Sequence, residues 1–252
     1  MKRIKLQIAD RSVDRCQDRM LGGVSIFVMW DTCLMGLAIS TRPDISNAVR
    51  SLARWYCSAP KAIHWKSALG ILAHINDTCG FGITYQRGTS VGIFLKSFLP
   101  TQTMPASKAT DRRSVSGGTI MCVGACVCWF SRTQKCATLS TSEAEHVALG
   151  DTVKEFLFLR QVWCFMIPGK GMPCFSAFED NQGALQLSKN PVSNSYSKHV
   201  DVRHHFLREL VLQGDIIVNH VPSEYQHADT LTKVLAFDLF AIHRRFFMNL
   251  SD

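Results

Sequence analysis

The chain has ten cysteines among its 252 residues but no Cys-X-X-Cys pair, the spacing typical of structural zinc sites and redox centres. Cys122, Cys126 and Cys128 lie in an apolar, strand-like run, where packing as reduced core thiols is favoured over zinc ligation. The cysteine pattern therefore predicts a reducing compartment, and we expect a cytoplasmic protein.

Long apolar runs are also missing. Residues 1–20 are studded with charge and contain no apolar core of a signal peptide. Residues 22–39 form the only candidate membrane span, and Asp31 interrupts it near its middle. We therefore expect no membrane partner.

Charge is scarce, and it is unevenly distributed. Hydrophobic residues make up 46% of the chain and charged residues 19%, a globular composition with room for one large or two small domains. The net charge of +8 suits a polyanionic partner, but residues 1–90 carry 12 Lys and Arg against 6 Asp and Glu, whereas residues 91–252 carry 16 against 14. Charge alone therefore does not mark the C-terminal part as a nucleic-acid binder.

The stretch from residue 138 to residue 149 predicts the start of a long helix. Ser140 and Glu143 have the spacing of a capping box, which fixes the first turn. Glu145 shares a face with Leu149, Val153 and Phe156, so it is expected to point toward the core. The alternative is a helix-end carboxylate that bends out to water.

The first half of the chain predicts a small helical piece followed by a hairpin. Residues 1–40 fit no pattern. Pro43 precedes a helical run with Ile45, Val49 and Leu52 on one face and Asp44 in its favourable first turn. A second helix is expected over residues 62–75, and strands over residues 81–85 and 91–98.

The second half alternates strands and helices. Residues 117–130 predict two strands that bend at Gly124, and a helix follows from 141 to about 166. Further elements are expected as a strand at 175–178, helices at 182–187 and 198–213, a strand at 215–221 and a last helix from 228. This order predicts an α/β fold, a mixed sheet flanked by helices.

Two more carboxylates stand at the ends of predicted elements. Asp180 follows an apolar strand, where open α/β sheets place ligand-binding groups. Asp229 lies at a helix start, where it is either a functional residue or simply the N-cap. Magnesium favours several oxygen ligands, so Glu145, Asp180 and Asp229, if they converge, are candidate metal ligands.

Six ordered motifs resemble the C-terminal end of copia-type retrotransposon polyproteins, the tail of reverse transcriptase followed by ribonuclease H. They are Thr41-Arg-Pro-Asp-Ile, Arg113-Ser-Val-Ser-Gly-Gly, Leu139-Ser-Thr-Ser-Glu-Ala-Glu-His-Val-Ala-Leu, Glu179-Asp-Asn-Gln-Gly-Ala, Lys198-His-Val-Asp-Val-Arg-His-His-Phe-Leu-Arg-Glu and Ala228-Asp-Thr-Leu-Thr-Lys.

The resemblance covers roughly residues 33–235. It implies a ribonuclease H-like fold with a five-stranded mixed sheet, which cleaves the RNA strand of an RNA/DNA hybrid with two Mg2+ ions. By position, it makes Glu145, Asp180 and Asp229 the catalytic and metal-binding carboxylates. It also divides the chain into an unassigned segment 1–40, a reverse-transcriptase remnant 41–90, a ribonuclease H-like domain 91–235 and a tail 236–252. Besides the cytoplasm, the resemblance adds a virus-like particle or the nucleus as an expected location.

The chain departs from this family twice. The polymerase signature of an aromatic residue followed by paired aspartates is absent, which excludes polymerase activity. The first-strand catalytic aspartate, in a stretch like Ala-Asp-Ala-Asp-Tyr-Ala, is also absent, and Phe98-Leu-Pro-Thr-Gln-Thr-Met-Pro stands there. Gln102 offers at most an uncharged oxygen, and cation affinity depends on ligand charge.

Our hypothesis for the second departure is a disturbed reading frame that is corrected before Ser107, through mutation, a sequencing error or a wrong gene model. One set of codons for Leu99–Pro105, read from the third base of the Leu99 codon, encodes Ala-Asp-Ala-Asp-Tyr-Ala. The nucleotide sequence tests this hypothesis, because codons that cannot be shifted to that reading exclude it.

The expected function is therefore an impaired, Mg2+-dependent ribonuclease H, and the alternative is an inactive remnant that only binds nucleic acid or has no activity. Basic residues expected to contact the phosphates of the hybrid are Arg112, Arg113, Lys198, Arg203 and Arg208. Ordinary solvated helix charge is the other interpretation of these residues.

Overall fold

The computed structural model describes residues 31–56, 62–85, 95–98, 101–102, 113–122, 124–135, 137–138, 140–169, 174–189 and 198–250. The chain divides into two compact units, Met1–Gly80 and Phe81–Asp252, and each is described by itself.

The N-terminal unit is helical. Residues 31–40 lie in a helix, followed by the 3-10 helix η1 (Pro43–Ile45), α3 (Ser46–Tyr56) and α4 (Ala62–Asp77). Ile45, Val49 and Leu52 are buried together, which confirms the predicted apolar face. Leu34 and Ala38 join the same core, so the part of the unassigned segment 1–40 that the structure describes belongs to this unit.

The expected strand at residues 81–85 is wrong. These residues form no regular element and pair with none of the described strands. The Thr84 N–H instead donates to the Met248 carbonyl (2.9 Å), and Asn249 Nδ2 donates to the Thr84 carbonyl (2.8 Å). Tyr85 donates through its hydroxyl to the Cys126 carbonyl (2.7 Å), so this segment attaches to the C-terminal unit. Of the expected partner strand over residues 91–98, residues 95–98 form a strand, and residues 91–94 lie outside the described residues.

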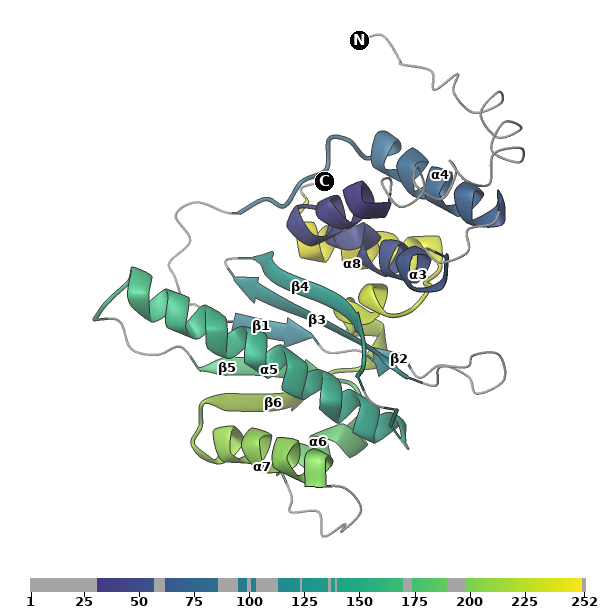
Figure 1. The fold of residues 1–252 in the computed structure, drawn as a ribbon. Helices are drawn as coiled ribbons and strands as arrows, with labels where there is room; N and C mark the ends of the chain where they lie inside the picture. Colours follow the sequence, from purple (N-terminus) through teal and green to yellow (C-terminus); the bar gives the residue numbers. More distant parts are fainter. Residues whose placement is uncertain are drawn as a thin grey trace. The chain divides into compact units, whose positions relative to one another are not determined.

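The C-terminal unit is built on one mixed sheet (Figure 1). Its strands are β1 (Leu95–Phe98), β2 (Thr101–Gln102), β3 (Val115–Cys122), β4 (Ala125–Thr133), β5 (Phe175–Glu179) and β6 (Ile216–His220). β3 pairs antiparallel with β4 and β1, and β5 pairs parallel with β1 and β6. The sheet has six strands where five were expected, because both β1 and β2 pair along β3.

The turn between β3 and β4 lies where the sequence predicted it. Gly124 has φ +81°, a left-handed conformation that glycine adopts without strain. The register of the pairing between β3 and β4 shifts between Ile120 and Met121, whose partners in β4 are Cys128 and Cys126.

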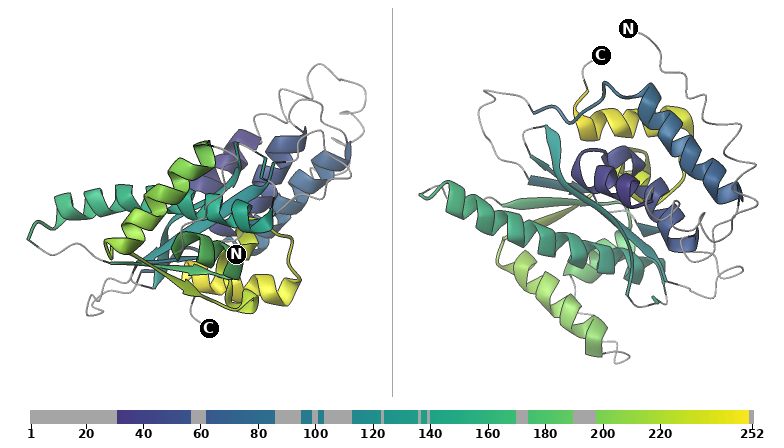
Figure 2. Two further views of the ribbon diagram at one scale, coloured as in Figure 1. Left: turned by 90° about the horizontal axis from the view of Figure 1, so that it is seen from below. Right: turned by 45° about the horizontal axis from the view of Figure 1, so that its top comes forward.

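Helices cover both faces of this sheet. α5 (Thr141–Met166), α6 (Gln182–Lys189) and α7 (Lys198–Leu212) lie on one face, where Leu149, Phe156 and Leu207 pack on Ile120 and Phe175. The 3-10 helix η3 (His227–Leu231) and α8 (Phe237–Met248) lie on the opposite face. Figures 1 and 2 show α5 crossing the sheet and α8 behind it.

The last two expectations for the C-terminus need correction. The single helix expected from residue 228 is two elements, η3 and α8, because the chain between them leaves the helical path. The segment 236–252 is not a tail. Phe247 and Met248 of α8 are buried against Met121 and Leu231, so α8 is part of the unit. Within the described residues, none of the helices has both the length and the apolarity that a membrane crossing requires.

Candidate metal centre

Glu145 lies inside the unit because of how α5 begins. Ser140 is the N-cap, and its hydroxyl oxygen accepts a hydrogen bond from the Glu143 N–H (3.1 Å), as the capping pattern predicted. Glu145 is 7% exposed, and Leu149 and Val153 below it on the helix are fully buried. The inward orientation is confirmed, and the alternative of a carboxylate in bulk water is wrong.

Two consecutive carboxylates follow from the end of β5. Phe175, Ala177 and Glu179 are the buried positions of the strand, and Phe175 and Ala177 pack in the core that α5 covers. Glu179 continues that face and is 0% exposed. Asp180 is half-buried, and its Oδ2 accepts a hydrogen bond from the Ser223 hydroxyl (2.8 Å).

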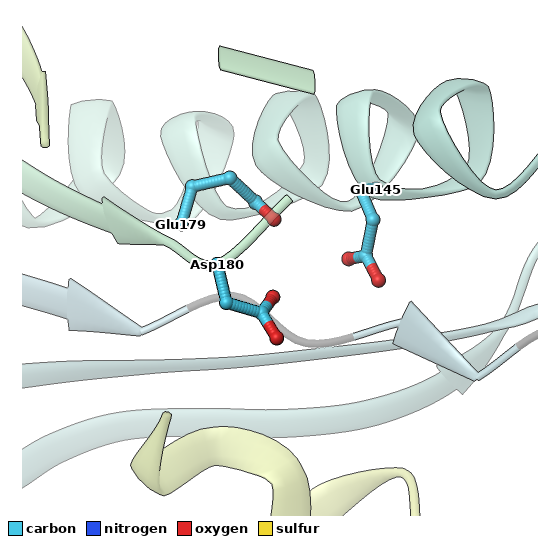
Figure 3. Close-up of side chains that lie close together, drawn as sticks. All are labelled: Glu145, Glu179 and Asp180. Atoms are coloured by element: carbon cyan, nitrogen blue, oxygen red, sulfur yellow. The ribbon is translucent and has the colours of Figure 1, made fainter. Parts of the chain in front are cut away.

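These residues form the one group of three or more candidate metal ligands in the described part of the chain. Glu145, Glu179 and Asp180 each offer a carboxylate oxygen, and the three oxygens lie within 4.8 Å of one another. Figure 3 shows the three side chains converging from α5 and from the end of β5. The structure thus brings together two of the predicted residues, Glu145 and Asp180, with one that was not predicted.

The sequence analysis missed Glu179, although a signal was present. Phe-Ser-Ala-Phe-Glu has apolar residues at its first and third positions, so strand alternation points the fifth residue to the same face. The predicted strand ended at Phe178, so its alternation was not extended to Glu179, which is in fact the last residue of β5.

Asp229 stands outside this group of three. It lies in η3 and is 7% exposed. The N-cap interpretation of Asp229 is wrong, since Gln226 occupies the cap position and no side chain caps the helix. The Asp229 carboxylate instead binds Lys233, with Nζ at 2.9 Å from Oδ1 and 3.0 Å from Oδ2.

Lys233 is the cation that links Asp229 electrostatically to the other acids. Burial acts to lower the pKa of Lys233, but the hydrogen bond to Asp229 and the charges of Asp229, Asp180 and Glu145 raise it overall. The pKa of Asp229 is raised by burial, opposed by Lys233 and raised again by Asp180. Lys233 therefore binds Asp229 directly, and the charges of Asp180 and Glu145 also favour its protonated form.

Glu179 has the most unfavourable environment for a free carboxylate. Its Oε1 accepts a hydrogen bond from the Asn181 N–H (3.0 Å). Burial raises the pKa of Glu179 well above its usual range, the charge of Glu145 raises it further, the Asn181 bond opposes this, and Asp180 adds to it. Buried acids at this spacing require a proton or a cation for charge balance.

The strand next to β5 ends beside this cluster. β1 runs parallel to β5, with Phe98 opposite Phe178, two residues before Asp180. The stretch from Leu99 to Pro105, which lacks the expected aspartate, therefore begins at the same edge of the sheet. Within it the structure describes β2, Thr101–Gln102, and the backbone of Gln102 pairs with Val115.

The predicted nucleic-acid contacts are only partly described. Arg113 is exposed just before β3, and Arg208 is half-buried on α7. Arg112 and the side chains of Lys198 and Arg203 lie outside the described residues, so their role stays a prediction.

The cysteines near the sheet behave as core thiols. Cys122, Cys126 and Cys128 are free, and Cys126 is fully buried. Burial raises the pKa of Cys126 to about 12 and that of Cys128 to about 11. The interpretation of this run as reduced, packed thiols is confirmed for these residues.

Comparison with known proteins gives sequence relatives but no matching family model. The chain is 32% identical over 209 residues to the retrovirus-related Pol polyprotein from transposon TNT 1-94 of Nicotiana tabacum, covering 83% of this chain and 15% of that protein. It is 31% identical over 199 residues to the one from transposon RE2 of Arabidopsis thaliana, covering 78% of this chain and 13% of that protein. The chain belongs to the family of copia-type retrotransposon Pol polyproteins.

The chain thus spans about 15% or less of the length of these polyproteins. It is also 30% identical over 126 residues to the secreted RxLR effector protein 161 of Plasmopara viticola, covering 50% of this chain and 85% of that protein.

Two solved structures resemble it more distantly. RNase H1 from Halobacterium salinarum aligns with 19% identity over 54% of this chain and 92% of that chain, at a TM-score of 0.38. The N-terminal RNase H domain of a Mycobacterium tuberculosis protein aligns with 12% identity over 61% of this chain and 98% of that chain, at a TM-score of 0.40.

Proposed function

We propose that the C-terminal unit is a ribonuclease H-like domain that hydrolyses the RNA strand of RNA/DNA hybrids with Mg2+, and that the chain as written does so weakly. The observation that carries this proposal is the convergence of Glu145 and Asp180, from α5 and from the end of β5, with oxygens within 4.8 Å. The family membership of the chain supports the same reaction class.

The donor set fits a hard divalent cation. Magnesium binds oxygen ligands and favours carboxylates held by different elements. The described cluster offers only carboxylate oxygens and contains no histidine or cysteine ligand. The buried, closely spaced acids carry more negative charge than Lys233 alone balances, so a divalent cation would relieve their repulsion.

Glu145, Asp180 and Asp229 are the proposed catalytic and metal-binding residues. Bound Mg2+ would supply a water of lowered pKa and stabilise charge on the leaving oxygen. Glu145 and Asp180 would hold the cation, and through it the reacting phosphate, between helix and strand. Asp229, whose carboxylate is within electrostatic range of Asp180, would contribute from η3 once its bond to Lys233 opens.

Binding of the hybrid is proposed to use backbone phosphates. Arg112, Arg113, Lys198, Arg203 and Arg208 are the residues that we assign to these contacts. Since each neutralised phosphate releases counterions, the affinity is expected to fall steeply with rising salt. Binding that is independent of salt would argue for another surface.

The activity of the chain as written is expected to be low. The stretch after β1 carries no carboxylate at the place where the family has its first catalytic aspartate, and a metal pair then loses one charged ligand. This loss favours a second candidate function, a protein that binds hybrids without cleaving them.

A cleavage assay separates these two functions. The chain in which Ala-Asp-Ala-Asp-Tyr-Ala replaces Leu99–Pro105 is incubated with a labelled hybrid in Mg2+ or in chelator, beside Glu145→Gln and Glu209→Gln variants of the same chain. Glu209 lies exposed on α7, so its variant is a charge-matched control. Cleavage in Mg2+ that Glu145→Gln abolishes and Glu209→Gln preserves supports the enzyme. Binding with no cleavage in every variant supports the alternative.

A further inference from the structure

We infer that Glu179 is a third carboxylate ligand of a divalent cation bound with Glu145 and Asp180, and that it supplies the negative charge that the missing first-strand aspartate would otherwise provide. This inference rests on the proposed function, because it concerns the same site. It assigns a ligand role to a residue that the sequence analysis did not name as a candidate.

The position of Glu179 is the first argument. Its carboxylate oxygen lies within 4.8 Å of oxygens from both Glu145 and Asp180, so all three can face one ion. Glu179 and Asp180 are consecutive in the chain but leave the strand on opposite sides, while Glu145 comes from the helix above (Figure 3). One cation would therefore be enclosed from three directions.

The second argument is the half-satisfied carboxylate itself. Oε1 of Glu179 is anchored by the Asn181 N–H at 3.0 Å, which fixes the direction of the group. The residue is 0% exposed, so water does not reach Oε2, and Oε2 accepts no hydrogen bond from the described residues. An oxygen in that state costs free energy unless a cation or proton binds it, and Figure 3 shows the carboxyl group turned toward the cluster.

The neighbouring strand end is the third argument. β1 finishes opposite Phe178 and provides no carboxylate in Lys-Ser-Phe or in Leu-Pro-Thr-Gln that follows. Glu179 restores the ligand charge count, on which cation affinity depends. It does so from the side of β5 that faces α5, not from the chain after β1. Cation binding is therefore retained, whereas cleavage, which needs the ions placed against the phosphate, stays weak.

A neutral isostere tests the inference in the full chain. Glu179→Gln keeps an oxygen that can accept the Asn181 N–H but removes the charge. Affinities for Mn2+ and Mg2+ are measured by isothermal titration calorimetry for the wild type, Glu179→Gln and the control Glu209→Gln. We expect at least about tenfold weaker binding in Glu179→Gln and no change in Glu209→Gln.

The other outcomes separate this inference from the proposed function. If Glu145→Gln and Asp180→Asn weaken binding but Glu179→Gln does not, Glu179 is a structural acid and the inference fails while the proposed function stands. If the wild type binds neither ion, both fail. Should Glu179→Gln not fold, as judged by circular dichroism, Glu179→Asp replaces it. The shorter carboxylate is expected to bind more weakly than wild type, and unchanged affinity overturns the inference.

Discussion

The buried ion pair of the N-terminal unit gives a quantitative prediction for Asp44→Asn. The Asp44 carboxylate is fully buried and is bonded by Arg42, with Nε at 2.9 Å from Oδ1 and Nη2 at 2.7 Å from Oδ2. His74 Nε2 lies 2.9 Å from Oδ2, and Arg42 also donates to Thr78 Oγ1 (2.6 Å). The Asp44 carboxylate thus joins Arg42 to His74, which is distant in the sequence, and Arg42 extends the network to Thr78.

The magnitude follows from the pKa of Asp44. Burial alone would raise it, but the hydrogen bonds from Arg42 and His74 and their charges lower it from 3.8 to about 2. At about 1.36 kcal/mol per pKa unit, the ionised group contributes roughly 2 to 3 kcal/mol to the free energy of unfolding. Because the folded pKa is depressed, this contribution is complete above the unfolded pKa of 3.8 and is lost as the pH falls through 2.

The Asp44→Asn change also leaves the Arg42 guanidinium buried without its counter-charge, so we expect a loss of about 3 to 5 kcal/mol at pH 7. Amide hydrogen exchange of α3 and α4 measures it, because opening of the unit exposes these amides. Asp77→Asn is the control, since Asp77 is exposed at the end of α4 and should change the stability by less than about 0.5 kcal/mol. A loss below about 1 kcal/mol in Asp44→Asn would refute the reasoning.

Two further changes probe the C-terminal unit. Lys233→Gln removes the ammonium group bound to Asp229, which competes with a metal ion for that carboxylate. We therefore expect the metal-free protein to lose stability in thermal unfolding, and its Mg2+ affinity to rise roughly tenfold in calorimetric titration. Weaker Mg2+ binding in this variant would contradict competition between Lys233 and the metal ion. Gly118→Ala places a Cβ 2.5 Å from Thr152 Oγ1, so a loss of about 1 to 3 kcal/mol is expected in denaturant unfolding. Gly70→Ala, which meets no atom within 4 Å, is the control, and equal effects of the two would exclude overpacking.

Local signals predicted those elements whose cause is local. The capping pair at Ser140, the apolar stripe below Glu145 and the turn at Gly124 depend on a few neighbouring residues, and each lies where expected. The failures have distant causes. Residues 81–85 have the composition of a strand but find hydrogen-bond partners at Met248 and Asn249, which sequence spacing does not reveal.

The buried ion pair of the N-terminal unit and the candidate metal centre were predictable only in part for the same reason. Asp44 was interpreted as a helix-dipole residue because its first-turn position is local, whereas its bond to His74 depends on how α4 folds back. Strand parity would have pointed to Glu179, but its approach to Glu145 depends on α5 lying over β5. Lys233 was quoted in a motif, yet its bond to Asp229 accompanies a turn after η3 in which the Lys233 N–H donates to the Asp229 carbonyl.

Restoration of the missing aspartate tests the central claim most directly. The chain as written and the chain with Ala-Asp-Ala-Asp-Tyr-Ala in place of Leu99–Pro105 are compared for Mg2+-dependent cleavage of an RNA/DNA hybrid. We expect the repaired chain to cleave at least roughly 100-fold faster, since loss of outer groups around a metal alone costs about 10- to 100-fold, and Asp180→Asn to abolish the gain. Equal cleavage by both chains, or a gain that survives Asp180→Asn, would contradict the assignment of the site.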